Sequence, residues 1–180
     1  MKRINALIVM AVLGVGSMAF GEEKILFDGN QPCWSSTEIK ADPENADNKV
    51  LFCVNAAKGG GPYMTPADKN WSTGAALSFK MYTNEADGHD IMIVCESNPE
   101  GTEGNYYYKK IKIDWKGWKI ISIPFKEFGV SRNVIGWTCI TRFMIATKGW
   151  GCEPNPKAEY YIGDVRLLDG MEKAKQEIVF

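Results

Sequence analysis

The feature of this sequence that most restricts its fold is the alternation of short apolar runs with clusters of turn-forming residues. After residue 21, helical periodicity is almost absent, and runs rich in β-branched and aromatic residues recur between Gly, Pro, Asn and Asp. The predicted strands are Lys24–Asp28, Val50–Asn55, Ala75–Thr83, Asp90–Glu96, Asn105–Asp114, Trp118–Pro124, Thr138–Ala146 and Glu159–Leu168, with a weaker one near Trp34–Lys40. Eight or nine strands favour an all-β fold, a β-sandwich of two antiparallel sheets.

The N-terminus has the pattern of a secretory signal. Lys2 and Arg3 give a positive start, Ile4–Gly16 is a nearly unbroken apolar run, and Ser17–Ala19 supplies small residues for a signal peptidase. A membrane anchor is the alternative, but spanning a bilayer takes about 17 or more apolar residues, and glycine interrupts this shorter run. We therefore expect a signal peptide over residues 1–21, a secreted (periplasmic or extracellular) protein, and no membrane span after cleavage.

The charge balance argues against a nucleic-acid partner. The chain has 21 Lys and Arg against 22 Asp and Glu, a formal net charge of −1, whereas nucleic-acid binders use a basic excess to neutralise phosphates. The length of 180 residues, without a linker, repeat or low-complexity block, fits one domain. We expect this β-sandwich domain over residues 22–169 and a C-terminal tail over residues 170–180.

The five cysteines form no obvious set of pairs, and their odd number leaves at least one thiol free. Cys53, Cys95 and Cys139 lie in apolar, strand-like runs, where a thiol packs as a small hydrophobic group. Cys33 and Cys152 lie in loop-like surroundings and are the best candidates for a disulfide, which export would permit. No C-x-x-C motif is present, so a structural zinc site is not expected.

Alternation within the predicted strands separates a core face from an outer face, because side chains two residues apart lie on the same side of a strand. The apolar positions assigned to the core are Leu77, Phe79 and Met81, then Tyr107, Ile111 and Ile113, then Phe143 and Ile145. The same alternation places Tyr82, Tyr106, Tyr108 and Arg142 on outward-facing positions.

Several segments resemble the carbohydrate-binding, galactose-binding-like jelly-roll domains attached to secreted bacterial polysaccharide lyases and glycoside hydrolases. Asp114–Lys119 has the sequence Asp-Trp-Lys-Gly-Trp-Lys and leads through a short β run into Pro124–Phe128. Asp68–Ser72 precedes a Leu-Ser-Phe strand, and Tyr160–Leu167 is similar to the closing strand of that family. The resemblance extends from about Leu26 to Leu168 and implies a jelly-roll β-sandwich.

One departure from the family concerns calcium. The closing strand of the family commonly carries two adjacent acidic residues, the first of which often contributes to a structural calcium site. Here Gly163 stands at that position, before Asp164. Since the neighbouring apolar residues are predicted to face the core, Gly163 is predicted to face it too, and an oxygen ligand is lost. We expect no cofactor; a structural calcium ion held by Asp164 with Asp28 and Glu23 is the alternative.

Sugars present apolar C–H faces that stack on aromatic rings, and hydroxyls that pair with planar donors and acceptors. The candidate ligand-binding residues are Tyr82, Tyr106, Tyr108 and Arg142 on one sheet face, His89 and Asp90 at a neighbouring loop edge, and Trp150 in a loop between glycines. Trp71, Trp115, Trp118 and Trp137 match scaffold motifs and are assigned to the core. Lys109, Lys110 and Lys112 would suit either an anionic uronic-acid polymer or a solvated edge.

These features favour a secreted, non-catalytic protein that binds a carbohydrate polymer. The alternative is a structural or assembly protein that uses the jelly-roll scaffold to bind a protein partner. Catalysis is less favoured, since His89 is the only histidine and the motifs G-x-S-x-G and H-E-x-x-H are absent. A glycosidase needs only two carboxylates, and a jelly-roll lyase only a tyrosine base near a cation such as Arg142. We assign no catalytic residues and no metal ligands.

Overall fold

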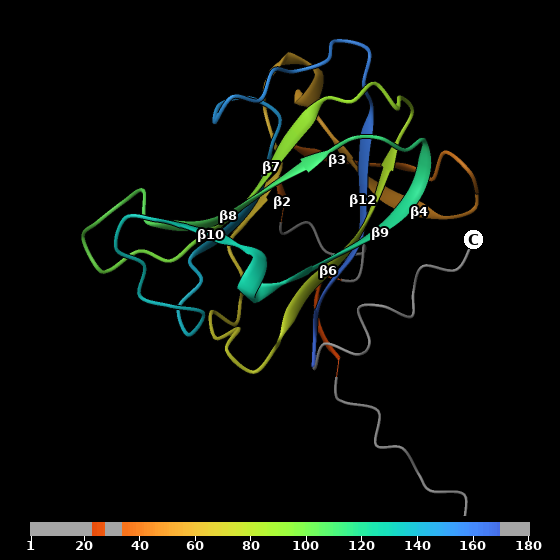
Figure 1. Cartoon of the computed structure of the whole chain (residues 1–180). Coiled ribbons are helices and arrows are strands. Elements are labelled where there is room, and N and C mark those ends of the chain that lie inside the picture. Colours follow the sequence, from red (N-terminus) through yellow and green to blue (C-terminus); the bar gives the residue numbers. More distant parts are fainter. Residues whose placement is uncertain (1–22, 28–33, 170–180) are drawn as a thin grey trace, which may run out of the picture.

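The computed structural model describes residues 23–27 and 34–169 (Figure 1). The predicted signal peptide, the predicted C-terminal tail, Asp28 and Cys33 lie outside these residues, so the expectations about them stay predictions. Within the described residues, no helix is long and apolar enough to cross a membrane.

Two antiparallel sheets of six strands each make up the fold (Figure 1). The first sheet has the order β3 (Thr37–Ala41), β4 (Lys49–Cys53), β12 (Tyr160–Leu168), β6 (Ala76–Thr83) and β9 (Gly117–Pro124), and β1 (Lys24–Phe27) also pairs with β12. The second sheet has the order β10 (Gly129–Ser131), β8 (Tyr106–Lys112), β7 (Asp90–Glu96), β11 (Arg142–Ala146), β5 (Tyr63–Met64) and β2 (Trp34–Ser35). The helical elements of the described residues are two short 3-10 turns, η1 (Ala56–Lys58) and η2 (Phe125–Glu127). The predicted all-β sandwich is confirmed.

The strand boundaries follow the sequence pattern except where turns interrupt it. Asp90–Glu96 has the predicted bounds. The predicted Thr138–Ala146 strand begins only at Arg142, after a turn in which the Cys139 N–H donates to the Gly136 carbonyl. The weak strand near Trp34–Lys40 divides at Ser36, where φ is 60°, so that β2 and β3 enter different sheets. The sequence does not predict β5 and β10, which are too short to show alternation.

The core lies between the two sheets and contains the residues expected there. Leu77, Phe79, Met81, Tyr107, Ile113, Phe143 and Ile145 are buried, and Ile111 packs against them with partial exposure. Phe79 on the first sheet and Phe143 on the second approach with ring centroids 6.2 Å apart. Contact across the gap therefore joins the sheets into one core.

The four tryptophans assigned to the core divide into two groups. Trp71 is fully buried, and Trp115 and Trp137 pack against the core with partial exposure. Trp118 is different, because its ring contacts Tyr82 on the outer side of the first sheet, with centroids 5.7 Å apart. The assignment of Trp118 to the core is therefore wrong; its neighbours Ile121 and Ile123 supply the buried side chains of β9.

The closing strand contains an irregularity that changes the side that Gly163 faces. The pairing of β12 with β6 shifts between Ile162 and Val165, and both of these residues are buried. The residues between them therefore break the strict alternation. A Cβ on Gly163 would lie 3.2 Å from Cβ of Lys80, an exposed residue of the outer face. The prediction that Gly163 faces the core is wrong.

The described cysteines are mostly buried. Cys53, Cys95 and Cys152 are buried, Cys139 is partly exposed, and none forms a disulfide with another described residue. Burial raises the pKa of the Cys53 and Cys95 thiols well above the ordinary value, so both are inert packing groups. The pairing of Cys152 with Cys33 stays a prediction.

Candidate functional site

An apolar strip with a tyrosine at each end crosses the outer face of the second sheet. Strand register places Tyr108 of β8 opposite Val94 of β7, Val94 opposite Met144 of β11, and Met144 opposite Tyr63 of β5. Tyr108 and Tyr63 are each 37% exposed. The strip therefore offers two accessible rings with lower, apolar side chains between them.

The next row of cross-strand neighbours on the same face begins with an aromatic residue on β8 and continues with charged residues on β7 and β11. Tyr106 stands opposite Glu96, and Glu96 stands opposite Arg142. Arg142 Nη1 donates to Glu96 Oε1 at 3.3 Å, and Asn98 Nδ2 donates to Glu96 Oε2 at 3.2 Å. The Arg142 guanidinium also lies 5.3 Å from the ring centroid of Tyr63. Both oxygens of the Glu96 carboxylate are thus engaged, and Arg142 links the polar row to the apolar strip.

A glycine on the edge strand supports the Tyr108 ring. Gly129 of β10 pairs with Tyr108, and a Cβ on Gly129 would lie 2.5 Å from Cζ of that ring and 2.8 Å from its Cε1. The ring therefore lies over the Gly129 backbone at a distance that no other residue would permit. One face of the phenol packs on the edge strand, and Tyr108 remains more than a third exposed.

Two side chains hold the Tyr106 hydroxyl in place. Trp150 Nε1 donates to Tyr106 Oη at 2.7 Å, and the Ser131 side chain also hydrogen-bonds to this oxygen. These two hydrogen bonds hold the pKa of Tyr106 below its ordinary value. The Tyr106 ring contacts both Tyr108 and Trp150 edge-on, with centroids 6.1 and 5.8 Å apart. Trp150 itself is 42% exposed and has a φ of 52°, a conformation uncommon for any residue but glycine.

A small second core lies beneath these rings. Tyr106 and Met144 pack against the buried cluster Met92, Val94, Ala146 and Cys152. Cys152 comes from the loop that carries Trp150, so this loop closes over one end of the sheet face. The aromatic platform, by which we mean Tyr106, Tyr108 and Trp150, is therefore supported from below and from the side.

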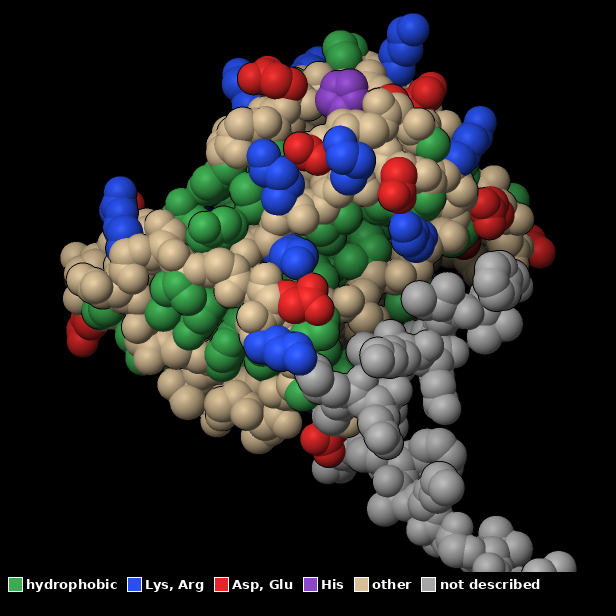
Figure 2. Space-filling model, viewed as in Figure 1, with side chains coloured by type: hydrophobic (Ala, Val, Ile, Leu, Met, Phe, Trp, Pro, Cys, Tyr) green, Lys and Arg blue, Asp and Glu red, His purple; other side chains and the backbone are tan. Residues whose placement is uncertain are grey.

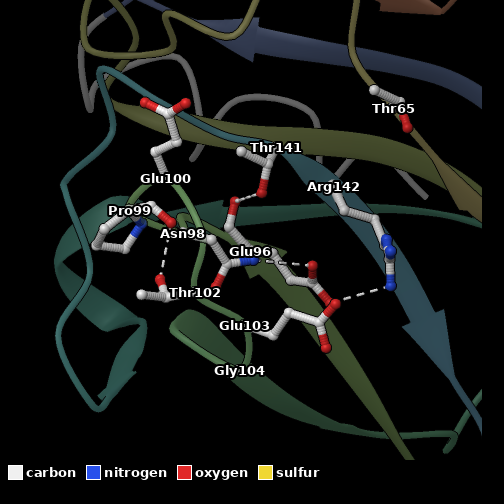
Figure 3. Close-up of a pocket in the computed structure, with 10 residues that line it drawn as sticks. All are labelled: Thr65, Glu96, Asn98, Pro99, Glu100, Thr102, Glu103, Gly104, Thr141 and Arg142. Carbon is white, nitrogen blue, oxygen red and sulfur yellow. Dashed lines mark hydrogen bonds and ion pairs between the residues drawn. The ribbon is translucent and has the colours of Figure 1, made fainter.

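A polar hollow of about 590 Å³ lies at Glu96 and Arg142, in the polar row that begins at Tyr106 (Figure 3). Its lining residues are Thr65, Glu96, Asn98, Pro99, Glu100, Thr102, Glu103, Gly104, Thr141 and Arg142. Figure 3 shows the Glu96 carboxylate between Arg142 and Asn98, with Glu103 nearby. Arg142 is the one cation among these lining residues, and three are glutamates. The hollow therefore offers many acceptors and a negative charge balance.

Tyr82 does not belong to this face. It lies on β6 of the first sheet, where it pairs with Tyr161 and Trp118. The prediction that it shares a sheet face with Tyr106, Tyr108 and Arg142 is wrong. The pleat of a strand determines which residues share a side, but it does not determine which sheet the strand joins.

His89 and Asp90 are also apart from the platform. Asp90 is on the same outer face, but its carboxylate lies 3.7 Å from the Nζ atoms of both Lys110 and Lys112. His89 Nδ1 lies 3.0 Å from Asp87 Oδ1, and the His89 backbone N–H donates to the same atom at 2.9 Å. Burial opposes ionisation of Asp87, but its contacts with His89 and a hydrogen bond from the Asn155 side chain outweigh this effect and hold the pKa of Asp87 below the ordinary value. No contact joins His89 or Asp90 to Tyr106, so their predicted binding role stays a prediction.

Two residues of this face, Tyr63 and Glu96, are not among the binding residues predicted from the sequence. Tyr63 lies in a two-residue strand after a run of glycines and proline, where no alternation is visible. Glu96 ends the apolar run of β7 and lies two positions after Val94. Its place on the face of Val94 follows from alternation, so the sequence did contain a signal for Glu96.

The described residues give no support for a metal site. Among them, no group of three or more His, Cys, Asp or Glu side chains is arranged to hold a metal ion. Asp164, a calcium ligand in the alternative above, accepts a hydrogen bond from Arg166 at 2.9 Å and lies 3.7 Å from Lys80 Nζ. Glu23 likewise accepts from Arg166 at 2.9 Å. Asp28, the third ligand in that alternative, lies outside the described residues, so the calcium alternative stays a prediction.

Solved structures of similar fold include two carbohydrate-binding modules and an agarase. The family 11 carbohydrate-binding module from Clostridium thermocellum, in complex with a β-1,3-1,4-mixed-linked tetrasaccharide, matches with a TM-score of 0.61 and 18% identity, over 83% of this chain and 96% of that chain. A family 30 module of a cellulosomal cellulase from the same organism matches with a TM-score of 0.57 and 12% identity, over 82% and 98%. An agarase matches with a TM-score of 0.56 and 10% identity, over 83% of this chain and 25% of that chain.

These identities show a shared fold, and the sequence itself shows the family. A search of the curated proteins gave no match. The family model for the carbohydrate binding domain of family 11 matches residues 16–134, which is more than half of the chain. This protein therefore belongs to the family 11 carbohydrate-binding domains.

Proposed function

We propose that this protein is secreted, does not catalyse a reaction, and binds a neutral polysaccharide on the outer face of the second sheet. The observation that carries the proposal is the position of the platform rings Tyr106 and Tyr108 beside the polar hollow of Glu96 and Arg142. The mixed-linked tetrasaccharide bound by the family 11 module of similar fold supports the ligand class.

The platform suits the apolar faces of sugar rings. Tyr108 lies over Gly129, and Tyr106 is hydrogen-bonded to Trp150, so both phenols are positioned before a ligand arrives. Binding then orders few side chains, which lowers its entropic cost. The apolar strip continues from Tyr108 toward Tyr63 and offers a path across the sheet for a chain of linked sugars.

The polar groups favour a neutral ligand. Arg142 and Glu96 present planar donor and acceptor groups that match adjacent hydroxyls. Glu100 and Glu103 in the hollow would repel a uronic-acid polymer. The lysines that would suit such a polymer are paired, since Lys110 and Lys112 flank Asp90 and Lys109 donates to Glu127 at 3.0 Å. On the face in view, Figure 2 shows basic and acidic side chains interspersed, with no large patch of one sign.

The arrangement of Glu96 supports binding rather than hydrolysis. A glycosidase uses two carboxyl groups about 5–10 Å apart, one to donate a proton and one to attack or activate water. Both Glu96 oxygens already accept hydrogen bonds, from Arg142 and Asn98. We therefore propose that Glu96 orients Arg142 and accepts from sugar hydroxyls.

A titration of three polymers tests this function. We expect the full mature protein to bind mixed-linked β-1,3-1,4-glucan or agarose, to bind polygalacturonate less, and to release no reducing sugar from any of them. Affinity gel electrophoresis at low and high salt provides the measurement. Binding of polygalacturonate alone, lost at high salt, would assign the function to the lysines instead. Binding of none of the three would favour the protein-partner alternative.

Substitution of Gly129 tests the position of the Tyr108 ring. Gly129→Ala is expected to weaken glycan binding by roughly three- to tenfold, because the new methyl group displaces a ring worth about 0.5–1.5 kcal/mol in stacking. The measurement is a calorimetric titration with a glycan oligosaccharide. The control is Gly129→Ala in a Tyr108→Ala background, where no further loss is expected because the displaced ring is absent. An equal loss in both backgrounds would contradict this account.

A further inference from the structure

A continuous row of aromatic side chains crosses the outer face of the first sheet, on the side of the sandwich opposite the platform. Strand register places Phe52 of β4 opposite Tyr161 of β12, Tyr161 opposite Tyr82 of β6, and Tyr82 opposite Trp118 of β9. Consecutive ring centroids are 5.1, 5.5 and 5.7 Å apart. Four strands therefore each contribute one ring to a single line, which we call the back row.

The back row is a surface feature rather than part of the core. Met81 and Ile162, which alternate with Tyr82 and Tyr161, are fully buried between the sheets. Phe52, Tyr82 and Trp118 are all partly exposed, and Tyr161 in the middle is 8% exposed. Three of the four rings therefore keep part of their surface accessible on the side away from the core.

Trp118 is held in a defined orientation. Its Nε1 donates to Asp42 Oδ1 at 2.9 Å, and Asp42 lies in the loop between β3 and β4, at the other edge of this sheet. A Cβ on Gly163 would lie 3.7 Å from Cζ3 of Trp118 and 3.2 Å from Cβ of Lys80. The indole therefore extends across β6 toward β12, where the irregular strand presents a residue without a side chain. Gly163 thus borders the indole, at a distance that corresponds to ordinary van der Waals contact.

The charges around the back row neutralise one another. Asp164 accepts from Arg166 at 2.9 Å and lies 3.7 Å from Lys80 Nζ. Lys40 lies 3.8 Å from Glu38, and its ammonium is 3.4 Å from the ring centroid of Phe52. These pairs leave little net field to attract a charged partner. They do leave planar donors and acceptors beside aromatic rings, which is the combination that recognises a neutral sugar.

We propose that the back row is a second glycan-binding site. The inference rests on the proposed function for its ligand class and adds a separate site on the opposite face. The two sheets pack about 10 Å apart, and their outer faces point in opposite directions. A short oligosaccharide therefore cannot reach both sites at once. The protein is therefore bivalent and links two polysaccharide chains.

Binding stoichiometry tests this inference. The probes are the β-1,3-1,4-mixed-linked tetrasaccharide and an agarose-derived oligosaccharide, titrated by calorimetry into the mature protein. We expect two binding events for wild type and one each for Trp118→Ala and Tyr106→Ala/Tyr108→Ala. We expect none for the combined variant, because each site weakens by roughly tenfold or more. Asp42→Ala removes the hydrogen-bond acceptor of the Trp118 indole without changing a strand residue. It is expected to weaken binding at the back row and to leave binding at the platform unchanged.

A second measurement concerns linkage of chains. Wild type is expected to increase the light scattering of the polymer that it binds, and each single-face variant is expected not to, since linkage needs both faces. Circular dichroism verifies that each variant is folded. If Trp118→Ala does not fold, Asp42→Ala takes its place as the back-row variant.

The outcomes separate the two proposals. A single event in wild type that survives Trp118→Ala and Asp42→Ala would overturn the back row and leave the proposed function intact. A single event lost only in those variants would place the glycan site on the first sheet and overturn the platform. An absence of binding to both probes would overturn both proposals.

Discussion

Replacing Tyr106 and Tyr108 together with alanine is expected to weaken glycan binding at the platform by roughly ten- to a hundredfold. Each stacked ring contributes about 0.5–1.5 kcal/mol beyond the area that it buries, and each ~1.4 kcal/mol is a factor of ten in affinity. Tyr108 lies flat over Gly129, and Tyr106 is held by Trp150 and Ser131. Both rings are therefore fixed before the ligand binds. Their removal spares little entropic cost of ordering side chains, so little of the lost stacking energy is compensated.

The titration is made in a Trp118→Ala background, which removes the contribution proposed for the first sheet. Lys110→Ala/Lys112→Ala is the matched control, because these residues lie on the same strand and face but pair with Asp90. That control is expected to change affinity by less than about twofold, given the small energies of exposed ion pairs. Unchanged affinity in a folded double tyrosine variant would exclude the platform as the site.

Trp71→Ala is expected to lower the free energy of unfolding by about 3–5 kcal/mol, the range for removal of a large buried aromatic side chain. Trp71 is 0% exposed, its ring centroid lies 6.2 Å from that of Phe143, and its indole N–H donates to the Asp68 carbonyl at 3.1 Å. The backbone N–H of Trp71 also donates to the Trp137 carbonyl at 2.7 Å. The alanine variant would leave a cavity beside β11 and an unpaired acceptor at Asp68.

Urea denaturation measures this loss, and Trp150→Ala is the matched control. Trp150 is 42% exposed, and its indole N–H donates to the Tyr106 hydroxyl. Its removal is expected to change stability by about 0.5 kcal/mol or less and to weaken binding, by releasing the Tyr106 ring. Equal stability losses in the two variants would refute the assignment of Trp71 to the core and Trp150 to the platform.

The sequence predicts the fold well because the fold depends on local patterns. Alternation identifies the buried residues Leu77, Phe79 and Met81, and turn residues bound the strand Asp90–Glu96. The motifs that resemble the family lie mainly in strands and turns of the sandwich. They therefore predict the scaffold more directly than the ligand-binding residues.

The prediction of the candidate site requires knowing which strands pair and where a strand is irregular, which local sequence patterns do not show. This explains the errors in that prediction. Tyr82 points outward as expected, but pairing of β6 with β12 and β9 places it on the first sheet. Gly163 faces outward because an irregularity in β12 interrupts the alternation. The role of Gly129 beneath Tyr108 requires pairing of β10 with β8 although β9 lies between them in the chain, and a three-residue strand gives no signal of it.

The central place of β12 determines the order in which the fold can assemble. β12 is the last described strand in the chain, yet it lies between β4 and β6 and also pairs with β1. The hairpin of β3 and β4 therefore has no partner within the first sheet until residues 160–168 have been synthesised. Pairings of such large sequence separation form slowly, because loop closure costs entropy before contacts repay it. Folding kinetics should thus be governed by the docking of one late strand, and a chain that stops before Tyr160 has a first sheet in separate pieces.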